Sequence, residues 1–312
     1  MKLNKLGYAF IGALAITSSA TVLASPTYYF PTTTLQDDFL DFLVDYDGDN
    51  FVSVGDRILT VFEVYSTSGA GQGSTDIAPE LTGIIDLKVT GLTASQEILG
   101  TYIMDFGAWD GGFLSGLSGF GLTNPIFTQA TNNTPLVGTV MQLWNGGGDS
   151  LSIDAATTNC TSFNDCVDRA SDGDFYLAAG FSNPLNVVRG TGLTNDPSVG
   201  SETDPGTGLG SISFALDFLQ NNTGRDFDQR LLSPFTPFAG QITGTAQVKG
   251  AKNIGSALDY NLSTGGSTGF GVFATGDIDA DVNPIPEPAS LALLSIGLIG
   301  MGAASRRGRK SS

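Results

Sequence analysis

Alternating apolar and polar positions run through most of the chain and predict a mostly β protein. Residues 211–218 are the clearest case, because Ile212, Phe214, Leu216 and Phe218 alternate with smaller or polar residues, as on a half-buried strand. Other segments rich in β-branched and aromatic residues and bounded by turn formers lie at 57–66, 81–91, 97–107, 136–144, 150–155, 174–181, 240–251 and 269–282. The pattern predicts about nine or ten strands, which we expect to form an elaborated antiparallel β-sandwich.

One early segment departs from this strand pattern. Residues 35–44 place Leu35, Phe39, Phe42 and Leu43 at helical spacing, with acidic residues on the opposite side. Such spacing predicts one short amphipathic helix near the N-terminus.

The domain organisation follows from composition and from one turn-rich segment. The chain has 312 residues, with 42 Gly, 20 Phe and only 14% charged residues, which suits short strands joined by tight turns. Residues 190–208 are dense in turn formers, as in a long surface loop or a junction between subdomains. We expect a single β-rich domain over residues 25–283, and two smaller domains are the alternative.

The N-terminal segment predicts export. Lys2 and Lys5 precede an apolar run at 6–16, and small residues lead up to Ala24. This order is typical of a secretory signal peptide over residues 1–24, removed by signal peptidase after Ala24. An uncleaved membrane anchor is the alternative.

The C-terminal segment has three parts in a fixed order. Pro286, Glu287 and Pro288 precede an apolar stretch at 289–304, and a basic tail with Arg306 and Arg307 follows. A helix over that stretch would be roughly 24 Å long, a little short of the ~30 Å hydrocarbon core of a bilayer. The basic tail would stay on the cytoplasmic side, which leaves the preceding domain outside.

This end of the chain, residues 284–312, resembles the PEP-CTERM sorting signal. The resemblance implies a Gram-negative exported protein that an exosortase-type enzyme processes. It also implies an inner-membrane intermediate held by the C-terminal helix, followed by delivery to the cell surface or the extracellular matrix. The resemblance covers about 27 residues and concerns the address of the protein, not its activity.

The charge of the predicted domain limits its partners. Between residues 25 and 285 the sequence has 8 basic residues against 30 acidic ones, a net charge of −22. Such a domain is repelled by nucleic acid and by anionic lipid headgroups. We expect dissolved cations to associate with it, and no nucleic acid.

An acidic stretch at residues 45–56 has the spacing of a calcium loop. The ligand positions of a twelve-residue EF-hand-type loop fall on Asp45, Asp47, Asp49, Phe51, Ser53 and Asp56. Phe51 would act through its backbone carbonyl, and Val52 would tether the loop to the core. We therefore predict Ca²⁺ as a bound cofactor, with a solvated acidic turn as the alternative.

Within these twelve positions the loop is similar to the dockerin type, which also ends in Asp. It departs from the pattern at Asn50, where glycine is expected, and at Asp56, where a longer bidentate Glu is usual. Dockerins have two such loops, whereas this sequence has one. We therefore infer a calcium loop and do not infer cohesin binding.

The remaining candidate positions are two cysteines and two groups of acids. Cys160 and Cys166 form an even pair in an exported chain, which predicts a small disulfide loop. The ladder 277, 279 and 281 places three aspartates on one strand face, which indicates a solvated edge strand. Asp172 and Asp174 indicate a turn.

The function remains open among three classes. The sequence has no histidine, which removes catalytic triads and most metal hydrolase sites, and we recognise no catalytic constellation. We expect a structural or adhesion protein of the surface or biofilm matrix. A carbohydrate-binding module is the first alternative, with stacking platforms from Trp109, Trp144, Tyr28, Tyr29 and Tyr102. A polysaccharide hydrolase with paired carboxylates is the second, and extracellular polysaccharide is a candidate partner.

Overall fold

The computed structural model describes residues 33–49, 51–69, 72–96, 100–117, 137–153, 158–194, 208–223, 227, 231–232, 239–250 and 270–282. Its strands are β1 (Thr33–Val44), β2 (Arg57–Gly69), β3 (Gln72–Ala94), β4 (Tyr102–Gly107), β5 (Thr139–Asn145), β6 (Asp174–Gly180), β7 (Val187–Leu193), β8 (Gly208–Asn221), β9 (Leu231–Leu232), β10 (Ala239–Gly240), β11 (Ile242–Gly250) and β12 (Phe270–Val282). A helix, α3, spans Phe163–Ala170.

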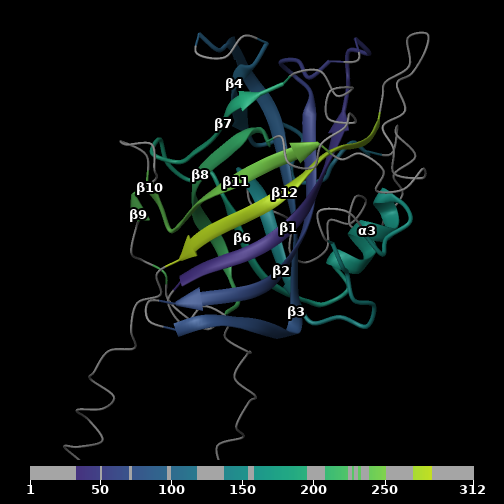
Figure 1. Cartoon of the computed structure of the whole chain (residues 1–312), viewed down its shortest axis with the longest axis vertical. Coiled ribbons are helices and arrows are strands. Elements are labelled where there is room, and N and C mark those ends of the chain that lie inside the picture. Colours follow the sequence, from purple (N-terminus) through teal and green to yellow (C-terminus); the bar gives the residue numbers. More distant parts are fainter. Residues whose placement is uncertain are drawn as a thin grey trace, which may run out of the picture.

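The strands close into an antiparallel barrel and not into a sandwich, so the predicted β-sandwich is wrong. Neighbouring strands pair in the order β11, β12, β1, β2, β3, β4, β7 and β8, and β8 then pairs with β11 to complete an eight-stranded ring. Figure 1 shows β11, β12, β1, β2 and β3 side by side along the barrel wall. Alternation along each strand is common to both architectures, and the closing β8–β11 pair is what distinguishes them.

The barrel wall forks on the side opposite β1. The middle of β3, at 81–85, pairs with β5, and its C-terminal part, at 88–94, pairs with β4. Strand β8 divides in the same way, because 211–215 pair with β7 and 217–221 pair with β6. The pairs β4–β7 and β5–β6 therefore complete the wall at different heights.

Inside the barrel, three phenylalanine rings lie over glycines on neighbouring strands. The cross-strand partners are Phe39 with Gly276, Phe62 with Gly83, and Phe214 with Gly244. A Cβ atom at any of these glycines would lie 2.2 to 2.6 Å from the ring, closer than non-bonded carbons approach. The missing side chains therefore make the space that the aromatic core occupies.

The segment predicted as a helix, residues 35–44, forms strand β1, so that prediction is wrong. Leu35, Phe39 and Leu43 face the barrel interior, whereas Phe42 belongs to a second core outside the barrel. A strand buried on both faces has apolar residues at irregular spacing. In residues 35–44 this irregular spacing happened to match the spacing of an apolar stripe along a helix, which explains the wrong prediction.

The second core lies between the outer surface of the barrel and α3. Phe163 of α3 packs edge-to-face on Phe42 of β1, with ring centroids 4.6 Å apart. Ser162 caps the helix by accepting a hydrogen bond from Asp165 N at 3.1 Å. Figure 1 shows α3 beside the strand wall. This helix was not predicted, although Ser162 is a residue type that commonly caps a helix N-terminus.

Most other predicted strands are confirmed with shifted ends, as β2 to β6, β8, β11 and β12. Of the predicted strand 150–155, the described residues contain only an isolated bridge between Ile153 and Thr158. Strand β7 was not predicted, and it occupies the start of the segment 190–208 that was expected to be a loop. Residues 195–207 and both terminal segments lie outside the described part of the chain.

Candidate metal centre

The acidic loop connects the first two strands of the barrel. It leaves β1 at Asp45 and enters β2 after Asp56, and both of these carboxylates are buried. Asp47 and Asp49 are exposed. Val52 is fully buried in the barrel core, as expected for a loop tethered at its eighth position. Any ion bound here would therefore act directly on the β1–β2 hairpin.

The aspartate side chains turn the loop backbone around one point. Asp45 Oδ1 accepts a hydrogen bond from Gly48 N at 2.7 Å, and Asp49 Oδ1 accepts one from Phe51 N at 2.7 Å. Asp47 Oδ1 accepts a third from Asp49 N at 3.2 Å. Gly48 has a φ of 73°, which a glycine adopts without strain. These local bonds hold three carboxylates on the inside of one tight turn.

Three of the predicted ligands converge. One carboxylate oxygen from each of Asp45, Asp47 and Asp49 lies within 4.8 Å of the others. Calcium–oxygen distances of roughly 2.3–2.6 Å put two ligands of one ion at most about 5 Å apart. The oxygens are therefore spaced as ligands of a single calcium ion would be. That a calcium ion occupies this position stays a prediction.

The remaining predicted ligands have other contacts. Both oxygens of Asp56 accept backbone hydrogen bonds, from Tyr46 N at 2.9 Å and from Ser53 N at 2.8 Å. Asp56 therefore closes the base of the loop. The Ser53 hydroxyl lies 2.8 Å from Asp47 Oδ2, next to the converging oxygens. Asn50, at the usual glycine position, lies outside the described residues.

The surroundings of these acids shift their pKa values. Partial desolvation raises the pKa of the Asp49 carboxyl, and the charges of Asp47 and Asp45 raise it further. Burial also raises the pKa of Asp56 to about 6. In contrast, a hydrogen bond from the Ser53 hydroxyl lowers the pKa of Asp47. A cation at this position would offset the repulsion that raises the pKa of Asp49.

A buried ion pair that was not predicted supports the loop. Arg57 donates from Nε and Nη2 to the two oxygens of Asp86, both at 2.5 Å, and neither side chain is exposed. Trp109 packs over the Arg57 guanidinium at 4.7 Å and stacks on Tyr46 at 5.0 Å. Leu114 N also donates to Asp86. A lone arginine directly after an acidic run was the available signal.

The other acidic groups serve as surface or turn residues. Asp279 and Asp281 are exposed and Asp277 is partly buried, while the residues between them face the core. The three therefore share the outer face, as predicted. Strand β12 pairs on both sides, with β1 and β11, so the prediction of an edge strand is wrong. Residues 171–173 form a turn, which confirms that prediction at Asp172, whereas Asp174 is the first residue of β6. Asp172 also accepts backbone hydrogen bonds from residues 148 and 149.

The predicted disulfide is present. Cys160 and Cys166 are bonded, with their Cα atoms 5.0 Å apart. The bond joins the segment before α3 to the first turn of that helix, and both residues belong to the second core. The disulfide therefore fixes the helix that covers β1 and β2.

The tryptophans proposed as sugar-stacking platforms are used in packing. Trp109 lies against Tyr46, as described above. Trp144 is 7% exposed and packs edge-to-face on Phe175, with centroids 6.3 Å apart. Tyr102 is partly buried against the barrel core, and residues 28 and 29 lie outside the described part of the chain.

The terminal segments are characterised by sequence comparison. No curated protein and no solved structure matches the chain. The predicted signal peptide and the predicted helix 289–304 lie outside the described residues, and within the described residues no helix is long and apolar enough to cross a membrane. Residues 284–310 match the model of the PEP-CTERM protein-sorting motif, which includes the predicted Pro286 to Pro288 triplet. The chain is therefore an exported protein with a PEP-CTERM motif, sorted by an exosortase to the cell envelope or surface.

Proposed function

We propose that this protein is a calcium-stabilised structural or adhesion component of the cell surface or extracellular matrix. The observation that carries the proposal is the convergence of Asp45, Asp47 and Asp49 in the hairpin loop between β1 and β2. The sorting motif supports a location in the cell envelope or at the surface, and calcium outside cells is plentiful enough for a weak site to suffice.

The position of the loop favours a stabilising role for the ion. Val52 anchors the loop in the barrel core, and Asp56 closes its base. An ion that binds the folded loop and not the unfolded chain stabilises the fold by about 2.7 kcal/mol at 100 times its dissociation constant. The packing of Trp109 and Trp144 makes a carbohydrate-binding module the weaker alternative.

Thermal melting tests the calcium part of the proposal. The melting temperature of the protein purified from its producing cells should rise from EDTA to millimolar CaCl₂ and should respond less to MgCl₂, because Mg²⁺ needs near-octahedral geometry. The double change Asp47→Asn with Asp49→Asn should abolish the response. The change Asp279→Asn with Asp281→Asn removes equal charge from an exposed face and should preserve it. Superimposable wild-type curves would refute calcium stabilisation.

Cell assays test the surface role separately. Cells lacking the protein should sediment and aggregate less in calcium-containing medium, and the wild-type chain should restore aggregation. The Asp47→Asn, Asp49→Asn chain should restore it only in part. Unchanged aggregation would refute the adhesive role, while specific retention on one polysaccharide in a binding panel would instead favour the carbohydrate-binding alternative.

A further inference from the structure

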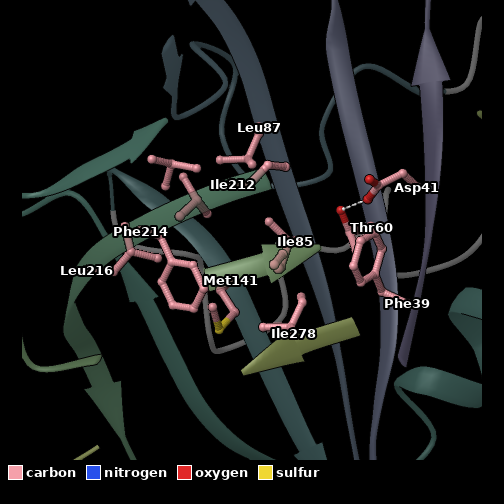
Figure 2. A pocket seen from close by; sticks show the side chains of 13 residues that line it. Phe39, Asp41, Thr60, Ile85, Leu87, Met141, Ile212, Phe214, Leu216 and Ile278 are labelled. Carbon is pink, nitrogen blue, oxygen red and sulfur yellow. Dashed lines mark hydrogen bonds between the residues drawn. The ribbon is translucent and has the colours of Figure 1, made fainter. Parts of the chain in front are cut away.

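The barrel encloses a cavity next to the fork in its wall. Its volume is about 40 Å³, and a water-sized group needs roughly 10–15 Å³ by this measure. Figure 2 shows Ile85 of β3, Phe214 of β8 and Ile278 of β12 converging on the same space. A molecule of about three or four non-hydrogen atoms therefore fits.

One ionisable side chain lines this apolar cavity. Among the described lining residues only Asp41 can carry a charge, and it is 3% exposed. Thr60 Oγ1 donates to Asp41 Oδ1 at 2.5 Å, and the described residues provide no second hydrogen bond to this carboxyl. Figure 2 shows the carboxyl turned toward Thr60. A buried carboxylate needs hydrogen bonds or a cation to offset its desolvation, so the second oxygen is an open acceptor.

Among the described residues, none that lines the cavity beside Asp41 carries a positive charge. Thr60 on β2 and Ala274 on β12 are its cross-strand partners. The nearby interior acid on the same strand face is Asp37, which is also buried. Burial and the charge of Asp277 raise the pKa of Asp37. The described lining of the cavity therefore leaves the charge of Asp41 for a ligand to neutralise.

We propose that the barrel cavity binds a short primary alkylammonium ion, with its nitrogen at Asp41 and its alkyl chain against Phe214, Ile85 and Ile278. A charge-assisted hydrogen bond to a carboxylate is about twice as strong as a neutral one, which favours an amine over an alcohol. A small carboxylate would be repelled. Calcium needs six to eight oxygen ligands, and among the described lining side chains only Asp41 and Thr60 carry oxygen.

The test uses n-propylamine, with 1-propanol and acetate as matched probes, because each of the three has four non-hydrogen atoms. Each is titrated to about 100 mM into protein with ¹³C-labelled isoleucine methyl groups, because a ligand of this size binds weakly. Propylammonium should shift the methyl signals of Ile85, Ile212 and Ile278. Propanol should bind roughly tenfold or more weakly, and acetate should not bind.

Two variants connect binding to the cavity. Asp41→Asn keeps the side-chain shape and should weaken propylammonium binding roughly tenfold or more. Ala246→Leu fills the cavity wall and should abolish binding with Asp41 intact. Asp174→Asn, at an exposed position, should bind as the wild type does.

The pH dependence provides a further readout. Burial raises the pKa of Asp41 to about 7, and the protonated carboxyl cannot pair with an ammonium ion. Binding should therefore weaken roughly tenfold for each pH unit below 7. Absence of propylammonium binding up to about 100 mM, or equal binding to the wild type, Asp41→Asn and Ala246→Leu, would overturn the proposal. Equal binding of propanol and propylammonium would also overturn it.

Discussion

Replacing Asp41 by Asn should change how the stability of the barrel depends on pH. Burial raises the pKa of this carboxyl from 3.8 to about 7, so the folded state holds its proton more tightly than the unfolded state does. The contribution of this group to the free energy of unfolding is therefore largest below about pH 4, falls as the pH rises to about 7, and is level above that. The uncharged amide of Asn removes this dependence at position 41.

The size of the effect follows from the two pKa values. A tenfold change in proton affinity is worth about 1.4 kcal/mol, so the whole interval from 3.8 to about 7 corresponds to about 4 kcal/mol. Between pH 4.5 and 8.5 the wild type should lose about 3 kcal/mol through this group. Asp41 is 3% exposed, so solvent screens little of this difference. Thr60 can donate to the Asn oxygen as it does to Asp41.

Urea unfolding from pH 4.5 to 8.5 measures the difference between the two chains. Asp41→Asn should match the wild type within about 1 kcal/mol at pH 4.5 and exceed it by about 3 kcal/mol at pH 8.5. Other acids with raised pKa values, such as Glu80, contribute equally to the free energy of unfolding of both chains. Their contributions therefore cancel in the difference between the two. Parallel stability curves for the two chains would show that Asp41 is not buried as the structure places it.

Two further predictions concern packing and the disulfide. Gly83→Ala should destabilise the barrel by about 1–3 kcal/mol, because its Cβ would lie 2.2 Å from the Phe62 ring. Adding Phe62→Leu should recover part of this lost stability. If urea unfolding shows that the destabilisations of the two single variants simply add in the double variant, the contact is contradicted. Replacing Cys160 and Cys166 by Ser should lower the free energy of unfolding by about 2 kcal/mol, as expected for a short closed loop. An unchanged denaturation midpoint would show that α3 stays packed on the barrel without the disulfide.

The strand pattern predicted the secondary structure but not the way the sheet closes. Alternating residues such as Phe214 and Leu216 mark a strand with one buried face in a sandwich and in a barrel alike. What decides the architecture is the pairing of β8 with β11, and a single sequence contains no direct signal for that pair. The glycines that accommodate Phe39 and Phe62 were equally uninformative, because glycine also marks turns.

Some residues of the candidate sites could also be predicted from the sequence, and others could not. The spacing of Asp45, Asp47 and Asp49 was sufficient to predict their convergence, since all three belong to one short loop. Asp41 was overlooked because the strand that contains it was interpreted as a helix, which would have put its carboxyl in solvent. The Arg57–Asp86 pair depends on the register between β2 and β3, which local sequence does not specify.

The place of β12 in the ring has a consequence for when the protein can fold. This last described strand lies between β1 and β11, so the barrel cannot close until the chain is complete through Val282. Contacts between distant segments form slowly, and β1 must wait for a partner some 240 residues away. The sorting motif begins at residue 284, within about 7 Å of the end of β12 along an extended chain. The sorting enzyme therefore acts on a motif that starts only two residues beyond the strand that joins β1 to β11, so the site of sorting and the strand that closes the barrel are neighbours along the chain.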